Sequence, residues 1–242
     1  MGVDMTSIRS RARSAGLVYV VMSVVGAPTL IVLPKFIVPG DPSATAQRIA
    51  EGEQTYRLLM LGDLAGGILF IFLGWSLYLL FESVDRKQAL LMLLLVLASA
   101  TIGILDAALL SPPLILRART DFLSAFTAPQ LDALAMAFLR IRGVEVRANE
   151  ALWGLWLVPF GILVIRSGFI PKIIGALLLI ASVGYVAMSV TPIGFPAYAD
   201  AVDGVAMVLI QGELAVILWL VIVGARVTEE RAASAAPRGA GA

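Results

Sequence analysis

Long apolar runs separated by short polar segments dominate the pattern of this chain. The clearest case is residues 150–180, where one apolar run ends at Arg166 and a second begins after Lys172. Gly168 and Pro171 lie between them, and both residue types end helices. A helix of about 20 apolar residues crosses the ~30 Å hydrocarbon core of a bilayer. The pattern therefore predicts a hairpin of two membrane-spanning helices.

The same pattern recurs along the whole chain and predicts an all-α polytopic membrane protein with a bundle of six transmembrane helices. We expect a cytoplasmic segment at residues 1–15, a single transmembrane domain at 16–226, and a disordered Ala- and Gly-rich cytoplasmic tail at 227–242. The expected spans are residues 16–33, 57–81, 89–110, 149–166, 173–190 and 204–225.

Two polar connections are expected to contain helices of their own. Asp41 followed by Pro42 is typical of a helix start and predicts a short helix at the membrane surface, ending near Gly52. The second helix is expected in the longest connection, residues 114–149.

In that connection, Thr127 and Gln130 fit a capping box. Apolar residues then recur with helical spacing from Leu131 to Ile141. We expect an amphipathic helix on the outer surface, ending near Gly143. A helix packed over the mouth of the bundle explains the pattern equally well.

Composition agrees with a membrane protein and excludes several functions. The 242 residues are 60% hydrophobic and 14% charged, and the mean hydropathy is +0.93. A net charge of +1 gives no basic surface for nucleic acid. The absence of cysteine and histidine excludes disulfides, thiolate metal sites, His-ligated haem and nucleophiles activated by histidine. We expect no cofactor and no metal site, and the lipid bilayer as the main partner.

Positive charge predicts the orientation in a bacterial cytoplasmic membrane. Six spans place both termini on the same side, and cytoplasmic loops are enriched in Lys and Arg. If the termini are cytoplasmic, the segments on that side hold ten of the 18 cations: Arg9, Arg11, Arg13, Arg86, Lys87, Arg166, Lys172, Arg226, Arg231 and Arg238. The outer loop with Arg117, Arg119, Arg140 and Arg142 is then a solvated or headgroup-facing surface.

The hairpin sequence WGLWLVPFGILVIRSGFIPKIIG at residues 153–175 resembles the bacterial domain of unknown function 4386 family. The resemblance covers nearly the whole chain outside the tail. It implies a six-helix bacterial membrane protein and assigns no activity. Other matching pieces are Ile37–Asp41 with Thr45 and Ala46, Arg57 with Asp63, Leu123–Phe126, and Gly212–Leu214 with Leu218 and Trp219. Many members carry a histidine shortly before the fourth span, where this chain has residues 139–143 (LRIRG), so a role for that histidine does not carry over.

Four acids fall inside the expected spans and are the candidate chemistry: Asp63, Asp106, Glu150 and Glu213. Inserting an ionisable residue costs about 2.5–3.5 kcal/mol, so such residues point inward or have a partner. Small residues share their helix faces, which is typical of packed surfaces. By the expected topology, all four lie in the outer half of the membrane.

The nearest arginines are Arg57 and Arg147. Four acids against two arginines leave surplus negative charge, so either some acids carry a proton or a cationic group is bound. The leading hypothesis is a small binding or transport unit with an outward-facing acidic pocket for a small cationic ligand or protons. The candidate pocket residues are Arg57, Asp63, Asp106, Arg147, Glu150 and Glu213.

Two rival hypotheses remain. In the first, Asp63 pairs with Arg57 and Glu150 with Arg147, and the protein is a structural or regulatory subunit whose acids only pack helices. In the second, two acids act as acid and base in an intramembrane carboxylate hydrolase. No catalytic motif supports an enzyme, and the sequence leaves the ligand and the oligomeric state open.

Aromatic and glycine residues have simpler interpretations. Aromatic residues near the expected interfaces are typical of the aromatic belts of membrane proteins. Gly62 and Gly66 form a GxxxG pair, which we expect to pack helices within the bundle. The aromatic residues are Tyr19, Trp75, Tyr78, Trp153 and Trp156.

Overall fold

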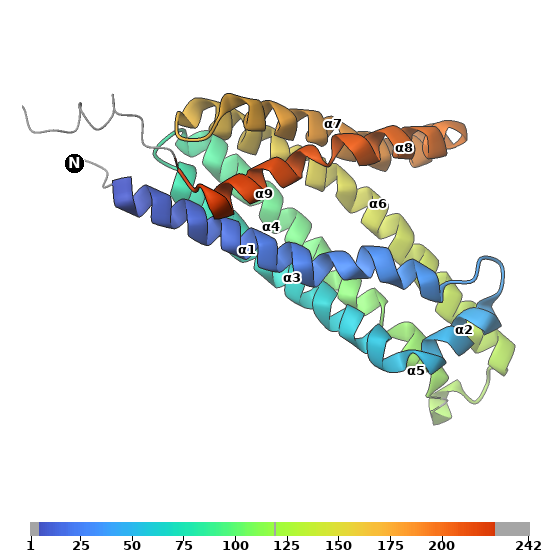
Figure 1. Ribbon diagram of the computed structural model, residues 1–242. Coiled ribbons are helices and arrows are strands. Elements are labelled where there is room, and N and C mark those ends of the chain that lie inside the picture. Colours follow the sequence, from blue (N-terminus) through green and yellow to red (C-terminus); the bar gives the residue numbers. More distant parts are fainter. Residues whose placement is uncertain (1–4, 119, 226–242) are drawn as a thin grey trace, which may run out of the picture.

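The computed structural model describes residues 5–118 and 120–225, and every regular element in these ranges is a helix (Figure 1). Six helical segments are long and apolar enough to cross a membrane, which confirms the all-α polytopic fold. The long helices are α1 (Met5–Val32), α3 (Glu53–Phe81), α4 (Arg86–Leu109), α6 (Ala128–Ser167) and α7 (Lys172–Gly194), and the sixth span consists of α8 (Ala199–Leu209) and α9 (Gly212–Ile222). The connections contain α2 (Pro42–Glu51), α5 (Pro112–Arg117) and the 3-10 turns Leu33–Phe36, Asp121–Leu123 and Pro196–Tyr198.

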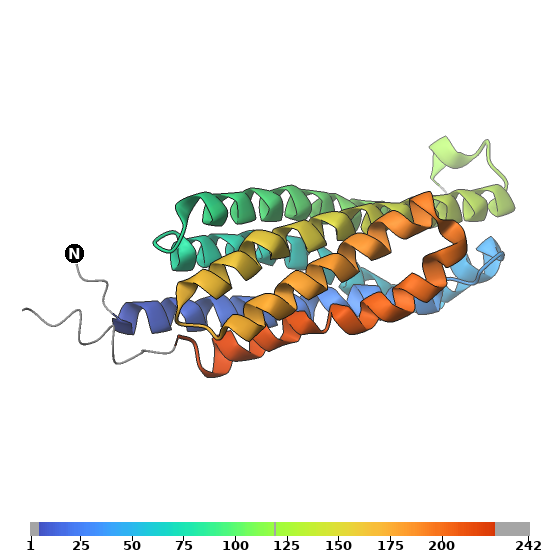
Figure 2. The same ribbon diagram turned by 90° about the horizontal axis from the view of Figure 1, so that it is seen from above.

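The long helices form a closed ring. Each long helix packs on the next one in the order α1, α3, α4, α6, α7. α9 closes the ring because it packs on both α7 and α1. The start of α1 and the end of α9 lie at one end of the bundle, while α2 and α5 lie at the other (Figures 1 and 2). The ring therefore has an interior that all six spans can line.

Two apolar cores fill the ring at different levels. The larger core lies toward the end of the bundle where α1 begins, and it includes Leu77, Leu157 and Phe160, each fully buried. The smaller core, with Ile49 and Tyr56, packs α2 against the other end. Asp106 lies on α4 between Ala100 of the larger core and Leu110 of the smaller one, so this buried charge belongs to the level between the two cores.

α1 begins at Met5, whereas the expected span begins at residue 16. Ala12 and Ala15 are fully buried, and the guanidinium of Arg11 donates to the carbonyl oxygen of Leu79 at 3.1 Å. Much of the expected cytoplasmic segment 1–15 is thus the first turns of a packed helix. Residues 1–4, Arg119 and the expected tail at 227–242 lie outside the described residues.

α6 is one helix of 40 residues, so the expectation of a separate surface helix ending near Gly143 is wrong. The capping box at its start is confirmed, with the Thr127 N–H donating to Gln130 Oε1 at 2.8 Å. The helix continues past Gly143, where Arg147 pairs with Asp203 and Asn149 bonds to Ser99. Buried Leu131 and Leu139 belong to its first part, which packs on α2 and α5 at the bundle end (Figure 2).

α2 has the start and end that the sequence predicts. The carboxylate of Asp41 accepts a hydrogen bond from the Ala44 N–H at 2.9 Å, and Gly52 follows the last helical residue. The helix lies across the bundle end opposite the start of α1 (Figure 1).

The sixth span is interrupted, although a continuous helix over residues 204–225 is expected. At Ile210 and Gln211 the backbone leaves the α-helical hydrogen-bond pattern. The Glu213 N–H donates to the carbonyl oxygen of Ile210, three residues earlier, at 3.1 Å. Gly212 lies against α7, and a Cβ there would be 2.8 Å from the Leu177 carbonyl oxygen. The interruption places Glu213 in the first turn of α9.

Gly62 and Gly66 pack α3 against α1, as expected for an internal GxxxG pair. A Cβ on Gly62 would lie 2.7 Å from the Val25 carbonyl oxygen, and one on Gly66 would lie 3.2 Å from the Gly26 Cα. The two helix backbones approach closely only because these positions lack side chains.

Candidate functional site

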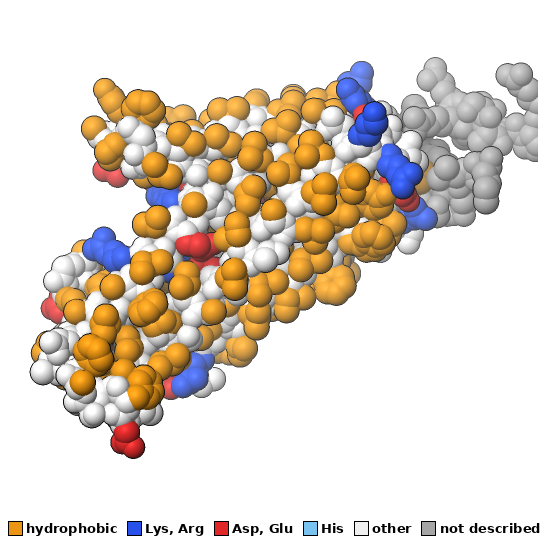
Figure 3. Space-filling model, turned by 180° about the vertical axis from the view of Figure 1, so that it is seen from behind, with side chains coloured by type: hydrophobic (Ala, Val, Ile, Leu, Met, Phe, Trp, Pro, Cys, Tyr) orange, Lys and Arg blue, Asp and Glu red, His pale blue; other side chains and the backbone are white. Residues whose placement is uncertain are grey.

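A cavity of about 320 Å³ lies inside the ring, between the two apolar cores. All six spans contribute to its wall. Figure 3 shows a hollow between two lobes at the end of the molecule away from the start of α1, with acidic and basic side chains exposed in it. The charged residues of the cavity wall are Asp63, Asp106, Arg142, Glu145 and Glu213.

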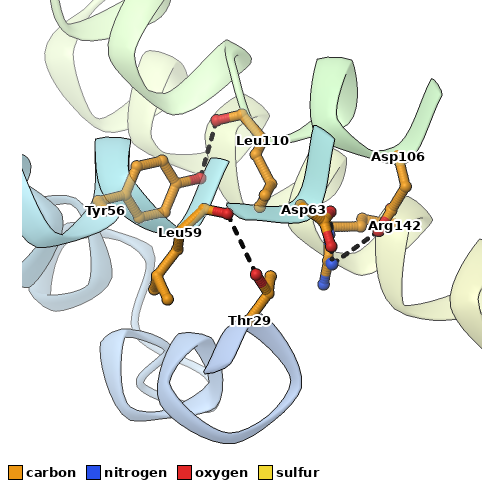
Figure 4. Close-up of polar contacts among 7 residues, drawn as sticks. All are labelled: Thr29, Tyr56, Leu59, Asp63, Asp106, Leu110 and Arg142. Carbon is orange, nitrogen blue, oxygen red and sulfur yellow. Dashed lines mark hydrogen bonds and ion pairs between the residues drawn. The ribbon is translucent and has the colours of Figure 1, made fainter. Parts of the chain in front are cut away.

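Arg142 of α6 connects the acids of α3 and α4. Its Nη2 lies 2.6 Å from Asp106 Oδ2 and 3.2 Å from Asp63 Oδ2 (Figure 4). Arg142 is 6% exposed and Asp106 4% exposed. A buried ion pair of this kind holds its geometry because removing either partner leaves an uncompensated charge.

Glu145 adds a third carboxyl group to this cluster, one helical turn after Arg142. The carboxyl group of Glu145 interacts electrostatically with Asp106, Arg142 and Asp63. Within the described part of the chain, both oxygens of Glu145 and Asp106 Oδ1 are buried and accept no hydrogen bond, and the buried Arg142 Nε–H donates none. Three carboxyl groups therefore share one guanidinium, and part of their hydrogen-bonding capacity is unused.

One face of α6 carries the polar and aromatic wall of the cavity. Arg142, Glu145 and Asn149 follow one another at three- and four-residue spacing, and Trp153 and Trp156 continue the same face. Asn149 ties this face to α4, because it accepts from Ser99 Oγ at 2.8 Å and donates to the Ser99 carbonyl at 3.3 Å.

Glu213 lies at another part of the cavity wall, between α1 and α7. Its Oε1 accepts a hydrogen bond from the Tyr19 hydroxyl, and its Oε2 accepts one from the Tyr185 hydroxyl at 2.9 Å. No Lys or Arg of the described ranges lies within ion-pair distance of it. Both oxygens of its carboxyl group are therefore hydrogen-bonded, but no cation of these ranges pairs with it.

Three of the six sequence-predicted pocket residues come together: Asp63, Asp106 and Glu213 line the same cavity. Glu150 is buried, yet it lies outside the cavity wall and pairs with Arg147 at 3.4 Å, as expected. Arg147 also binds Asp203 of α8 at 2.5 Å, which links α6 to the sixth span.

The expected pair of Arg57 with Asp63 is wrong. Arg57 binds Glu53 at 2.8 Å at the exposed start of α3. Asp63 lies further along the helix and faces Arg142 of α6. The two residues are six positions apart, which corresponds to about 600° of helical rotation. Because this is not a whole number of turns, the two side chains project from different faces of α3.

Sequence reasoning missed Arg142, Glu145 and Tyr185. Arg142 is expected on the outer, solvated or headgroup-facing surface, and Glu145 falls in the connection 114–149 without an expected role. Their helical spacing from Asn149 becomes visible only if α6 is continuous. Tyr19 and Trp156 were expected at the membrane interface, but they are 1% and 3% exposed and belong to the cavity wall. Trp75, at 51% exposed, remains on the surface.

The charged residues of the cavity wall are mostly acidic. No group of three or more Asp or Glu residues in the described ranges is arranged to hold a metal ion. Four carboxyl groups facing one guanidinium favour a cationic guest and repel an anionic one.

Comparison with known proteins places the whole bundle in one family. Over 78 residues the chain is 38% identical to an uncharacterized protein of Archaeoglobus fulgidus, which covers 32% of this chain and 44% of that protein. The chain thus spans less than half the length of that relative. No solved structure matches. Residues 14–224 match the family described as Domain of unknown function (DUF4386), and the chain therefore belongs to that family of multi-pass membrane proteins.

Proposed function

We propose that this protein is a membrane-embedded binding or transport unit that takes a small cation, or protons, into its acidic cavity. We place it in a bacterial cytoplasmic membrane with both termini in the cytoplasm. The cavity would then face outward, because its charged end lies toward the bundle end that carries α2 and α5.

The observation that carries the proposal is the excess of acidic over basic side chains on the wall of one cavity. Asp63, Asp106, Glu145 and Glu213 face the cavity, and Arg142 is the only cation on its wall within the described part of the chain. Asp106 Oδ1 is buried, and no described residue donates a hydrogen bond to it. Burying such an oxygen is costly unless it is paired, so a proton or a bound cation would satisfy it.

The interrupted sixth span also supports a binding role. Discontinuous membrane helices commonly form the substrate and ion sites of transporters, near the middle of the bilayer. Here the interruption at Ile210 and Gln211 lies on the cavity wall, next to Glu213.

The two rival hypotheses have less support. A structural subunit would need no space beside its buried acids, whereas these acids line a cavity of about 320 Å³. A carboxylate hydrolase needs water between its acid pair, and the guanidinium of Arg142 lies between Asp63 and Asp106 (Figure 4).

Thermal stability in maltoside detergent tests the proposal. Potassium chloride, spermidine and tetramethylammonium chloride are titrated at constant ionic strength into the wild type and into Asp106→Asn. The matched control is Asp121→Asn, because Asp121 is exposed and outside the cavity.

At least one cation should raise the melting temperature of the wild type and of Asp121→Asn, and Asp106→Asn should respond less. If no cation stabilises the wild type, or if all three proteins respond alike, the acids only pack helices.

A further inference from the structure

Two tyrosines, Tyr19 and Tyr185, bind the carboxyl group of Glu213, and each packs against a tryptophan of the cavity wall. Trp156 packs against Tyr19 with ring centroids 6.1 Å apart and against Phe70 at 5.4 Å. On the other side of Glu213, Trp153 packs edge-on against Tyr185 at 6.0 Å. All five rings line the cavity.

Glu213 joins these two aromatic groups. It accepts hydrogen bonds from Tyr19 of one group and Tyr185 of the other. The hydroxyl donors satisfy both oxygens but bring no positive charge. A negative charge enclosed by aromatic rings is the environment that recognises alkylated ammonium ions, because each ring face attracts a cation and its carbon surface packs alkyl groups.

From this arrangement we infer that the cavity binds an alkylated organic ammonium ion, with its charge beside Glu213 and its alkyl groups against Trp153, Trp156 and Tyr185. This inference rests on the proposed function and names its ligand class.

The dimensions and chemistry of the cavity favour an organic cation over simpler guests. A volume of about 320 Å³ lies at the small end of ligand pockets, which span about 300–1,000 Å³, and a bare ion would fill little of it. A divalent metal would need several oxygen ligands, and the described residues offer no such group. A neutral guest would leave Glu213 without a counter-charge.

The acidic cluster at Arg142 would support the same ligand from the rest of the wall. Asp106 is 4% exposed, and its Oδ1 has no donor within the described ranges. Glu145 adds two further buried oxygens of the same kind. These groups keep the whole cavity attractive to cations, while the aromatic rings select the alkylated ones.

The probe is tetramethylammonium chloride, titrated into the purified full chain in maltoside detergent and followed by the shift in melting temperature. Potassium chloride at equal ionic strength controls for screening, and 2,2-dimethylpropan-1-ol is a neutral probe of similar shape. Tetramethylammonium should shift the melting temperature at concentrations where neither control does.

Point variants then test which residues form the tetramethylammonium site. Glu213→Gln and Trp153→Leu should each weaken tetramethylammonium binding at least tenfold. Tyr185→Phe keeps the ring and should stay within about threefold of the wild type. Trp75→Leu and Glu53→Gln, both outside the cavity, should bind as the wild type does. Unliganded melting curves confirm that each variant is folded.

A choline headgroup would present the same chemistry from a lipid. A second titration therefore uses lysophosphatidylcholine, with lysophosphatidylglycerol as the anionic control. Stabilisation by the choline lipid that Glu213→Gln abolishes would support the ligand class with a lipid as its source. Stabilisation by free tetramethylammonium would assign a water-soluble source.

The cation titrations distinguish failure of this inference from failure of the proposed function. If spermidine or potassium stabilises the protein through Asp106 while tetramethylammonium does not bind, the cavity binds cations but not alkylated ones. Tetramethylammonium binding that survives both Glu213→Gln and Trp153→Leu would also overturn the inference.

Discussion

Arg142 Nη2 lies 2.6 Å from Asp106 Oδ2, and the two side chains are 7% and 5% exposed. This contact joins α6 to α4 at the level of the cavity, and Asp63 extends it to α3. An arginine inside a membrane bundle is stable only when acidic partners compensate it. One guanidinium therefore links three helices.

Arg142→Met should destabilise the protein by about 3–5 kcal/mol, the usual effect of removing one partner of a buried ion pair. The cause is that Asp63, Asp106 and Glu145 lose their counter-charge together. Arg140→Met is the control, because Arg140 lies on the exposed face of the same helix. Unfolding in sodium dodecyl sulfate measures the stability of both variants.

A compensating variant separates charge from packing. In the Arg142→Met background, Asp63→Asn with Asp106→Asn should recover part of the lost stability by removing two uncompensated charges. If Arg142→Met costs less than about 1 kcal/mol, the cluster does not hold the helices as described.

The fold is readable from the sequence because each apolar run is a local signal. Residues 57–81 and 173–190 need only their own composition to be recognised as spans, and Asp41 with Pro42 forms a helix start from adjacent residues. The continuity of α6 is harder to read. Gly143 and the charged residues after it look like a loop until their partners on α3 and α4 are known.

The site depends on contacts that no local pattern contains. Asp63 meets Arg142, 79 residues away, and the Tyr19 hydroxyl meets Glu213, 194 residues away. Insertion cost alone placed Asp63, Asp106 and Glu213 inside the bundle. It could not choose their partners, because pairing depends on which helices become neighbours in the ring.

Two alanine substitutions at glycines should have opposite effects. Gly62→Ala places a methyl group 2.7 Å from the Val25 carbonyl oxygen, a backbone atom of α1 that cannot rotate away. It should cost about 1–3 kcal/mol, as overpacking does. Gly103→Ala meets no atom of the described residues within 4 Å and should stabilise α4 by about 0.4–1 kcal/mol. Equal effects in detergent unfolding would contradict the close α1–α3 contact.

Both termini should be cytoplasmic. A reporter active only in the periplasm, fused after Ala225 at the end of the described chain, should stay silent, whereas the same reporter in the α7–α8 turn should be active. The reason is the excess of Lys and Arg in the short segments on the side of the termini. Activity of the terminal fusion would reverse the orientation and turn the cavity toward the cytoplasm.

Arg147 should restrain α8. It binds both carboxylate oxygens of Asp203, at 3.1 and 2.5 Å, and this pair connects α6 to the first half of the sixth span. Because the arginine is partly exposed, Asp203→Asn should cost only about 0.2–1 kcal/mol. Hydrogen exchange should nevertheless accelerate in α8. Asp200→Asn, on the exposed side of the same helix, should change neither quantity.

Filling the cavity tests whether it is the binding space at all. Gly103 lines the cavity, and a Cβ there meets no atom within 4 Å, so Gly103→Leu can extend into the open volume without disturbing helix packing. Gly143→Leu is the matched control, because a Cβ on Gly143 also meets nothing within 4 Å, while that residue is exposed and outside the cavity wall. Both variants should fold, and both replace a helical glycine by the same residue. Gly103→Leu should abolish the melting-temperature shift caused by whichever cation stabilises the wild type, and Gly143→Leu should retain it. Unchanged binding in Gly103→Leu would place the cation elsewhere on the protein, whatever the four carboxyl groups suggest.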